Sequence, residues 1–296
     1  MSFNSIASML EAASRQNAPL YKVICEDDCR ENGYSEEASH AKIKALWLAM
    51  RQSSAQYNPA DRSNSGFIGG DAARLRAAAD AGKLLGGTYF LRVTEEALKV
   101  AECNACMKRI VAAPTAGSCG VLPAVLLPLT EEREVEEEKI LQALYIAAGF
   151  GQVAALRASV SGAQGGCQAE IGVASAMAAA ALTHITGGTD AQCAHAFAIA
   201  LSSLLGLVCD PVAGLVEIPC VKRNVIGAIN AVSACDMALA GIESHIPADE
   251  VIDAMGEIGD ALPAALRETG LGGLAATPTG QRLAQSVMAR GQGEGI

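Results

Sequence analysis

The sequence predicts an all-α fold in which a single helical domain spans residues 1–296, and three observations support this prediction. Hydrophobic residues make up 51% of the chain, which is enough to bury a sizeable core. Several segments carry apolar residues at helical spacing, whereas no alternating stretch is long enough to specify a sheet. No internal repeat or low-complexity linker divides the sequence, so we expect one domain.

Charge and hydropathy exclude several classes of function. The 22 basic and 32 acidic residues give a formal net charge of −10, and the absence of a basic stripe argues against nucleic acid and anionic membranes. The longest apolar runs fall short of the roughly 18 residues that a membrane-spanning helix needs. The first residues do not resemble a signal peptide. We therefore expect a cytoplasmic chain whose ten cysteines are reduced thiols, metal ligands or redox groups.

The first third of the chain contains one clear helix start. Residues 1–34 are weakly patterned, and Ser35 then predicts the N-cap of a helix with two glutamates in its first turn. This helix must stop near Pro59. Residues 64–71 (NSGFIGGD) follow as a flexible loop, for which a plain turn remains the alternative to a functional role.

A second helix is predicted to start at Thr94, again as an N-cap before two glutamates. It contains the pair Cys103 and Cys106 at CxxC spacing. Such a pair can be a redox motif or half of a zinc site, but the second half-site is missing. We interpret both residues as ordinary helix cysteines.

Residues 113–120 (APTAGSCG) form a Gly-rich loop, and an apolar run begins directly after it at Val121. A loop of this kind offers free backbone N–H groups and the positive end of a helix dipole, which suits a carboxylate or a phosphate. It is not a Walker loop, because the Lys-Ser/Thr ending is absent. A capping loop that binds nothing is the alternative.

The middle of the chain is predicted to hold its most buried helices. Thr130 predicts an N-cap before an acidic first turn, in a helix that becomes apolar at Ile140. Residues 159–166 are small and predict another loop. The Ala-rich segment 171–185 is apolar on nearly every side, as is typical of a central helix with close neighbours.

The remaining elements continue this pattern. Residues 189–192 (TDAQ) match a capping box, which opens a buried helix that continues to Gly206. Helical character resumes over 225–242, and apolar positions recur at helical spacing over 251–262. Residues 276–296 are interpreted as a Gly-rich tail.

Three cysteines share a distinctive setting. Cys167 follows two glycines, Cys209 precedes Asp-Pro, and Cys220 follows a proline, so we expect all three in loops where thiolates can turn toward one metal. The helical hairpin between the first two would bring them back together. Cys119 fits the same description, so spacing alone leaves three or four ligands open. Other cysteines lie within helical patterns and are expected to behave as small hydrophobes: 103, 106, 193 and 235.

The number of ligands matters chemically. Four thiolates close an iron-sulfur centre, whereas three leave one iron able to act as a Lewis acid. Zinc with three thiolates also remains possible, although no histidine lies near these segments in the sequence. We interpret the three cysteines as ligands of a cluster with one open iron.

Three blocks of the sequence carry a resemblance to a known family. Residues 113–127 (APTAGSCGVLPAVLL), 159–174 (SVSGAQGGCQAEIGVA) and 209–224 (CDPVAGLVEIPCVKRN) resemble the α chain of the iron-sulfur L-serine dehydratases. The similarity extends from about residue 65 to residue 275. It implies an all-helical catalytic domain of the L-serine dehydratase α type.

The resemblance also implies a cofactor and a reaction. Cys167, Cys209 and Cys220 would hold a [4Fe-4S] cluster, and Cys119 would line the site. The implied activity is that of an oxygen-sensitive lyase of amino-acid catabolism and gluconeogenesis, which converts L-serine to pyruvate and ammonia through an aminoacrylate. The open iron would take the substrate hydroxyl while a base removes the α-proton.

The substrate would be held by two loops and one arginine. Arg223, close after a cluster ligand, could clamp the carboxylate, with a structural ion pair as the alternative. The loop candidates for the carboxylate and ammonium groups are Ser65, Gly66, Thr115, Gly117 and Ser118.

No general base is evident. In the family a Ser-rich, His-containing loop of the β part approaches the site, and this sequence has no such motif, so the resemblance implies a separate β chain. It also lacks the terminal cysteine by which some single-chain relatives cap the open iron. Two other functions remain open: an iron-sulfur L-cysteine desulfidase, and a non-catalytic subunit with a structural metal. A pyridoxal-phosphate enzyme is not expected, because no lysine stands beside a phosphate loop.

Overall fold

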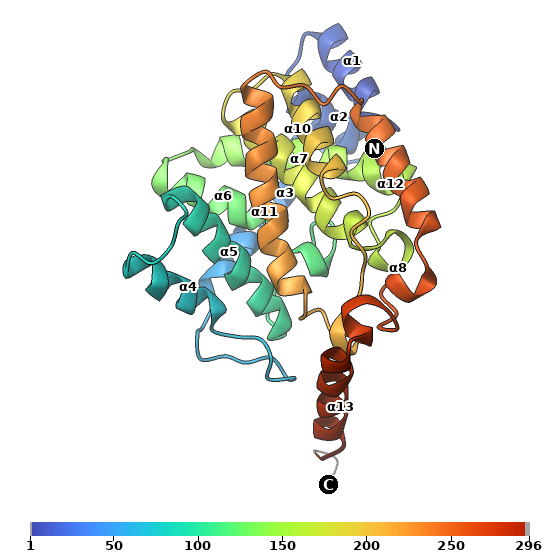
Figure 1. Cartoon of the computed structure of the whole chain (residues 1–296). Helices are drawn as coiled ribbons and strands as arrows, with labels where there is room; N and C mark the ends of the chain where they lie inside the picture. Colours follow the sequence, from blue (N-terminus) through green and yellow to red (C-terminus); the bar gives the residue numbers. More distant parts are fainter. Residues whose placement is uncertain (1, 294–296) are drawn as a thin grey trace.

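The computed structural model describes residues 2–293 and is built from α-helices joined by short turns (Figure 1). Within that range no β-strand forms, and the only sheet-like pairing is an isolated bridge between Cys209 and Arg267. The prediction of an all-α fold is therefore confirmed. In Figure 1, α1 lies at the top of the molecule and α13 projects at the bottom.

The weakly patterned N-terminal segment forms two helices, α1 (Ile6–Gln16) and α2 (Leu20–Asn32). The predicted helix after Ser35 is confirmed as α3 (Glu36–Ala55). The Ser35 hydroxyl accepts a hydrogen bond from the Ala38 N–H at 3.2 Å, as an N-cap does. Buried residues of α1 and α2 belong to the main core, so this segment is an integral part of the fold.

The prediction of an N-cap at Thr94 is wrong. After α4 (Asp71–Asp80), α5 runs from Thr88 to Ala105, and Thr94 lies inside it with its hydroxyl donating to the Phe90 carbonyl at 2.9 Å. The glutamates that follow Thr94 are buried in the middle of the helix, where Arg and Lys side chains pair with them. Their ion pairs, rather than a helix dipole, stabilise them there.

Thr130 is not an N-cap either. It lies within α6 (Val121–Glu132), where its hydroxyl donates to the Leu127 carbonyl at 2.8 Å, and the next helix, α7 (Glu137–Arg157), starts later. The acidic run spans the turn between the two helices. By length and composition α7 could cross a membrane, but 67% of its apolar window is buried inside the protein, so it is a core helix.

The Ala-rich central helix and the capping box are confirmed. A short helix α8 (Gly162–Gly165) and a π-turn (Gln168–Gly172) precede α9 (Val173–Ile185). The Thr189 and Gln192 side chains cap α10 (Asp190–Ser202) reciprocally, although α10 ends before the predicted Gly206.

Two of the last three helices, the first and the third, differ from the prediction. α11 (Cys220–Leu239) starts directly at Cys220, and α12 (Ala248–Ala261) follows as expected. The Gly-rich tail forms α13 (Pro278–Gly293). Short 3-10 turns complete the chain: Ala116–Ser118, Val212–Gly214, Ala264–Leu266 and Gly273–Ala276.

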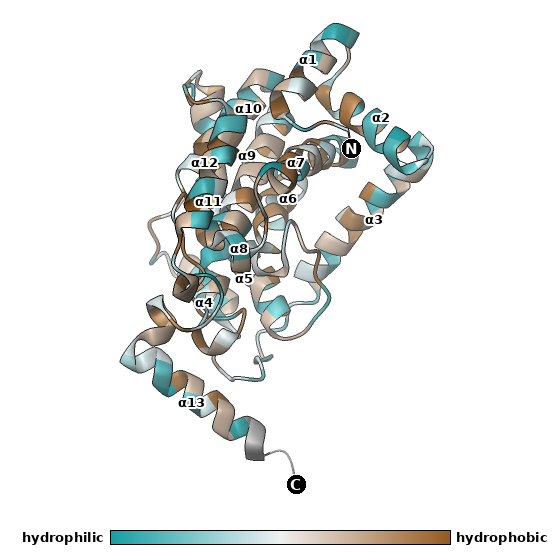
Figure 2. Ribbon diagram, turned by 90° about the vertical axis from the view of Figure 1, so that its right-hand side faces the viewer, coloured by the Kyte–Doolittle hydropathy of each residue, from teal (hydrophilic) through white to brown (hydrophobic). Residues whose placement is uncertain are grey.

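Helices α7, α9, α10 and α11 form the centre of the core. The alanines of α9 are fully buried, and these small side chains let α7, α10 and α11 pack closely around it. Figure 2 shows hydrophobic residues concentrated in these inner helices, while α13 extends away from the body. These packed helices therefore support the segments that carry Cys167, Cys209 and Cys220.

Candidate functional site

The three predicted cysteines come together in the fold. Cys167, Cys209 and Cys220 are buried, with 3%, 3% and 9% of their surfaces exposed. The thiol of Cys209 lies close enough to both other thiols for their charges to affect its pKa. Among the described residues, no three His, Cys, Asp or Glu side chains converge tightly enough to hold a single metal ion. A four-iron cluster bonds each cysteine to a different iron, so its ligands need not converge on one point.

Two of these cysteines stand at helix starts, not in loops as predicted. Cys167 precedes the π-turn with helical backbone angles, and Cys220 is the first residue of α11. Only Cys209 lies in an extended segment, where its N–H donates to the Leu266 carbonyl at 2.9 Å. The first turn of a helix leaves N–H groups free and favours a thiolate, so these positions suit metal ligands as well as loops do.

Gln168 holds the turn that follows Cys167, a role that was not predicted from the sequence. Its side chain is fully buried. Its Oε1 accepts from the Gly206 N–H at 2.8 Å, and its Nε2 donates to the Met255 carbonyl at 3.0 Å. The backbone N–H of Gln168 also donates to the Leu207 carbonyl at 2.9 Å. These bonds join the turn after Cys167 to the segment that leads to Cys209.

Arg223 forms a structural ion pair within the site. Its guanidinium donates to Asp210 Oδ1 and to the Val208 carbonyl, both at 2.8 Å, and lies beside the Cys167 thiol. The second Asp210 oxygen accepts from the Leu274 N–H, also at 2.8 Å. Arg223 therefore connects α11 to the segment that carries Cys209 and adds positive charge next to the thiols.

The predicted Gly-rich loop lies against the start of α11. Within it, the Thr115 and Ser118 side chains form a reciprocal capping box around the 3-10 turn. Asn224, buried on α11, accepts from the Gly120 N–H at 2.8 Å and donates to the Gly117 carbonyl at 2.7 Å. Asn224 also donates to the Cys220 carbonyl at 3.0 Å. One side chain thus links the loop to a cysteine.

Glu170 is the main site residue that sequence reasoning missed. Its Oε1 accepts from the Thr115 hydroxyl at 2.7 Å, and its Oε2 lies 3.7 Å from the Cys209 sulfur. Burial raises the pKa of Glu170, and the nearby charge of Glu268 raises it further. The only available signal was an acidic residue in an otherwise apolar segment, three positions after a predicted ligand.

The Ser65-Gly66 loop contacts the segment that precedes Cys220. The buried Ser65 hydroxyl donates to the carboxylate of Glu217, which shortly precedes Cys220. The Ser65 carbonyl accepts from the Arg290 guanidinium on α13, which also packs near Gly66. No hydrogen bond in residues 2–293 joins this loop to the Gly-rich loop.

The thiols are suited to binding a metal that displaces their protons. Burial raises the pKa of Cys167 to about 11 and that of Cys220 to about 12, and burial raises the pKa of Cys209 as well. Without a metal they are neutral thiols at pH 7, so loading must release protons. Three buried soft donors next to one another match the donor set of an iron-sulfur cluster.

Cys119 lies at the end of the Gly-rich loop, close to α5. It is buried, and the cysteine whose charge affects its pKa is Cys103 rather than any of the three above. Cys103 lies within α5, as predicted, and Cys106 stands at the C-cap of the same helix.

None of the four histidines contributes to the site. His40 lies 3.1 Å from Glu138, and His184 packs edge-on against Tyr21. The ring of His195 accepts from the backbone at Ser244, and His245 lies on the surface beside Glu243. The part of the chain that the structure describes therefore offers no histidine base near the cysteines.

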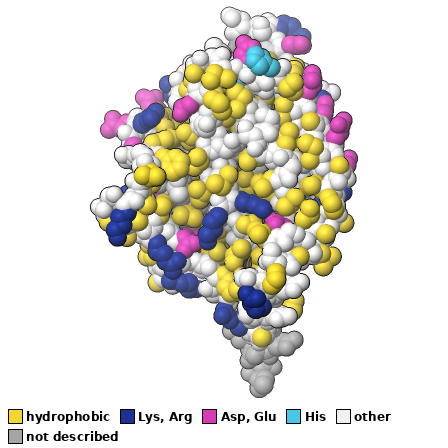
Figure 3. All heavy atoms as spheres, in the orientation of Figure 1, with side chains coloured by type: hydrophobic (Ala, Val, Ile, Leu, Met, Phe, Trp, Pro, Cys, Tyr) yellow, Lys and Arg dark blue, Asp and Glu magenta, His cyan; other side chains and the backbone are white. Residues whose placement is uncertain are grey.

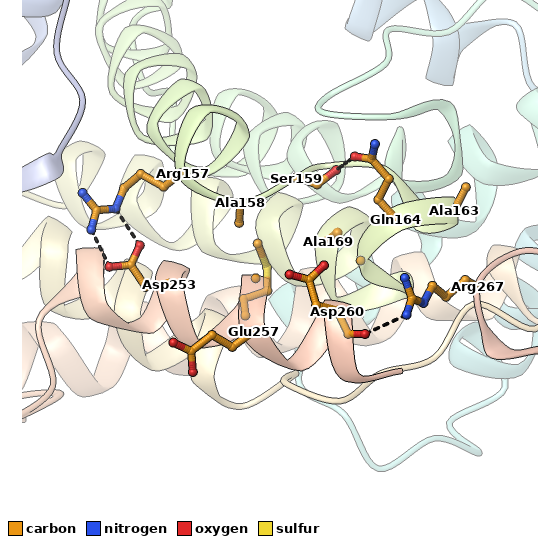
Figure 4. Close-up of a pocket in the computed structure, with 14 residues that line it drawn as sticks. Arg157, Ala158, Ser159, Ala163, Gln164, Ala169, Asp253, Glu257, Asp260 and Arg267 are labelled. Atoms are coloured by element: carbon orange, nitrogen blue, oxygen red, sulfur yellow. Dashed lines mark hydrogen bonds and ion pairs between the residues drawn. The ribbon is translucent and has the colours of Figure 1, made fainter. Parts of the chain in front are cut away.

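A cavity of about 570 Å³ lies between α8 and α12. Figure 4 shows Arg157 paired with Asp253 at one end of this cavity and Arg267 bound to the backbone of Asp260 at the other. Neither Glu170 nor any of the three cysteines lines it. On the face shown in Figure 3, Lys and Arg side chains gather over the lower half, although the chain is acidic overall.

Comparisons with known proteins agree with the resemblance found in the three blocks. A family model described as Serine dehydratase alpha chain matches residues 15–275. The L-serine dehydratase, alpha chain, of Peptoniphilus asaccharolyticus is 41% identical over 289 residues, which cover 97% of this chain and 99% of the relative. A probable L-serine dehydratase, alpha chain, of Bacillus subtilis is 56% identical over 225 residues, 76% of this chain and 75% of the relative.

An L-serine dehydratase of Haemophilus influenzae is 36% identical over 291 residues, but the match covers 92% of this chain and only 61% of that longer protein. The family model spans most of the chain, and the Peptoniphilus protein is similar to it over nearly its whole length. The chain belongs to the serine dehydratase alpha chain family.

Proposed function

We propose that the chain is the catalytic α chain of a cytoplasmic L-serine dehydratase, a lyase that converts L-serine to pyruvate and ammonia. Family membership and relatives that carry this name support the reaction. The observation that carries the proposal is that three buried cysteines from separate segments lie near one another. Glu170 and Asn224 link two of them, Cys209 and Cys220, to the Gly-rich loop. The substrate would bind between the cysteines and this loop.

Cys167, Cys209 and Cys220 would hold a [4Fe-4S] cluster as its three thiolate ligands. When bound, such a cluster supplies Lewis acidity that makes the substrate hydroxyl a better leaving group. Arg223 balances part of the thiolate charge, since its guanidinium lies beside Cys167. Its ion pair with Asp210 keeps it in this position.

The Gly-rich loop would bind the substrate carboxylate. The first N–H groups of the 3-10 turn Ala116–Ser118 have no intrahelical acceptor and can donate to an anion. Thr115, Gly117 and Ser118 form this cradle, and Asn224 holds it against α11. The remaining N–H groups of Arg223 would add a charged donor on the same side.

The base that removes the α-proton is proposed to come from a separate β chain. All four histidines of this chain are engaged or remote from the cysteines. The Haemophilus relative extends well beyond the matched region and so has room for a β part in the same polypeptide. Ser65 and Gly66 would support this side of the site through Glu217, close to Cys220.

The test is anaerobic purification of the α chain with its β partner, followed by electron paramagnetic resonance of the reduced cluster with and without L-serine. A substrate-dependent change in the spectrum supports the proposal. An unchanged spectrum would indicate a saturated, structural centre and refute it. Full turnover of L-serine by the α chain alone would refute the part assigned to the β chain, and faster sulfide release from L-cysteine would identify a desulfidase instead.

A further inference from the structure

Glu170 lies in the candidate site but has no role in the reaction proposed above. The π-turn Gln168–Gly172 places its side chain between the Gly-rich loop and the extended segment around Cys209. Wide turns of this kind occur frequently at functional sites, because they redirect one side chain out of the regular helix pattern. Thr115 binds one carboxylate oxygen, and the Cys209 sulfur lies beside the other.

The Glu170 carboxylate has no cationic partner within residues 2–293. It forms no ion pair, and the nearest arginine, Arg223, is already held by Asp210 and the Val208 carbonyl. The other charged group that affects Glu170 noticeably is the carboxylate of Glu268, which is also negative. A largely buried carboxylate is unfavourable unless a positive group pairs with it, so this position favours a cationic group from a ligand.

Two glycines keep the space around this carboxylate free of side chains. A Cβ atom at Gly162 would lie 2.5 Å from Glu170 Oε2 and 3.1 Å from the Cys209 sulfur. A Cβ atom at Gly117 would lie 3.1 Å from Glu170 Oε1. Glycine at both positions therefore lets the backbone approach the carboxylate closely, and a side chain at Gly162 would displace it.

We propose that Glu170 binds the α-ammonium group of the substrate and makes the site selective for amino acids over hydroxy acids. This inference rests on the proposed function. An ammonium group has three donors, which can bond the two oxygens of the Glu170 carboxylate. The β-hydroxyl of serine is then directed toward the cysteines, since Cys209 is adjacent to Glu170.

The inference makes a specific statement about substrate class. L-Glycerate has the carboxylate and the β-hydroxyl of serine but carries a hydroxyl in place of the ammonium group. Its α-hydroxyl cannot neutralise Glu170, so the wild-type site should reject it. Replacing Glu170 by glutamine keeps the shape of the side chain and removes the charge, which should abolish this selectivity.

The experiment uses the cluster-loaded complex of the α and β chains and measures the binding of L-serine and L-glycerate by the change in the cluster spectrum. For Glu170→Gln we expect unchanged iron content and L-serine affinity lowered by about 10-fold to 100-fold, the usual effect of losing a charged hydrogen bond. The affinity for L-glycerate should stay the same or increase. Glu170→Asp, which keeps the charge, should retain the preference for serine.

Glu268→Gln is the matched control, because it removes the same charge from an exposed neighbour. It should leave the serine-to-glycerate ratio at the wild-type value. The inference is overturned if Glu170→Gln keeps that ratio, or if it loses its iron and so shows that Glu170 supports the cluster instead. If L-serine fails to change even the wild-type spectrum, the proposed function itself fails, and the inference fails with it.

Discussion

Replacing Asn224 with alanine tests whether one side chain holds the Gly-rich loop against α11. Asn224 is 1% exposed, and its amide bonds the Gly120 N–H, the Gly117 carbonyl and the Cys220 carbonyl. Alanine leaves the two loop groups without their partner. Each buried polar group that loses its partner costs about 1–3 kcal/mol, so for the two groups we expect the free energy of unfolding to fall by about 2–6 kcal/mol.

The assay is urea denaturation of the metal-free chain, followed by helical circular dichroism. The matched control is Asn230→Ala on the same helix, since Asn230 donates to the Ser175 hydroxyl at 2.9 Å and to the Ala200 carbonyl at 2.8 Å. Both variants should be destabilised, but only Asn224→Ala should also weaken L-serine binding in the loaded complex. A loss below about 1 kcal/mol for Asn224→Ala would refute the reasoning, because the loop would then be held by other contacts.

Three further predictions concern other parts of the chain. Metal analysis should find normal iron in Cys119→Ala and little iron in Cys167→Ala, and equal losses would mean that four cysteines bind the cluster. Gly162→Ala should raise the KM for L-serine, because the new methyl group would lie 2.5 Å from Glu170 Oε2, and an unchanged KM would place the substrate elsewhere. Burial lowers the pKa of His184 below its ordinary value of 6.5, so stability should fall as pH drops through this region. Denaturation above and below pH 6.5 should show a weaker pH dependence for His184→Gln, and an identical dependence would count against a buried neutral ring.

The helical fold followed from local patterns, but two helix starts did not. Thr94 and Thr130 are each followed by two glutamates, as an N-cap residue often is. Both threonines nevertheless lie inside helices, where the glutamates do not mark a first turn. Glu95 pairs with Arg92 and Lys99 of α5 itself and also with Arg76 of α4, whose position depends on tertiary structure. The acidic run after Thr130 is divided between α6 and α7. The turn between these helices, residues 133–136, contains no glycine or proline to mark it in the sequence.

The cysteines and the Gly-rich loop could be selected from sequence because glycine and proline mark unusual backbone positions next to reactive side chains. The roles of Gln168, Glu170 and Asn224 could not be predicted in this way. Each is a polar residue in a helical segment, and its role depends on partners that lie 38 to 107 positions away in the chain. Tertiary packing brings these partners within hydrogen-bonding distance, since Gly206 follows α10, whereas Thr115 and Gly117 belong to the Gly-rich loop.

Asp210 shares its two oxygens between Arg223 in the site and the Leu274 N–H, which lies in the turn before α13. When the segment that carries Cys209 opens, the Leu274 amide loses its acceptor and exchanges its proton with solvent. Leu274 itself is surface-exposed and remote in sequence from the cysteines. Exchange of the Leu274 amide therefore reports local opening of the segment that carries Cys209. Hydrogen-exchange mass spectrometry can follow this opening at a position that contacts neither the iron nor the substrate.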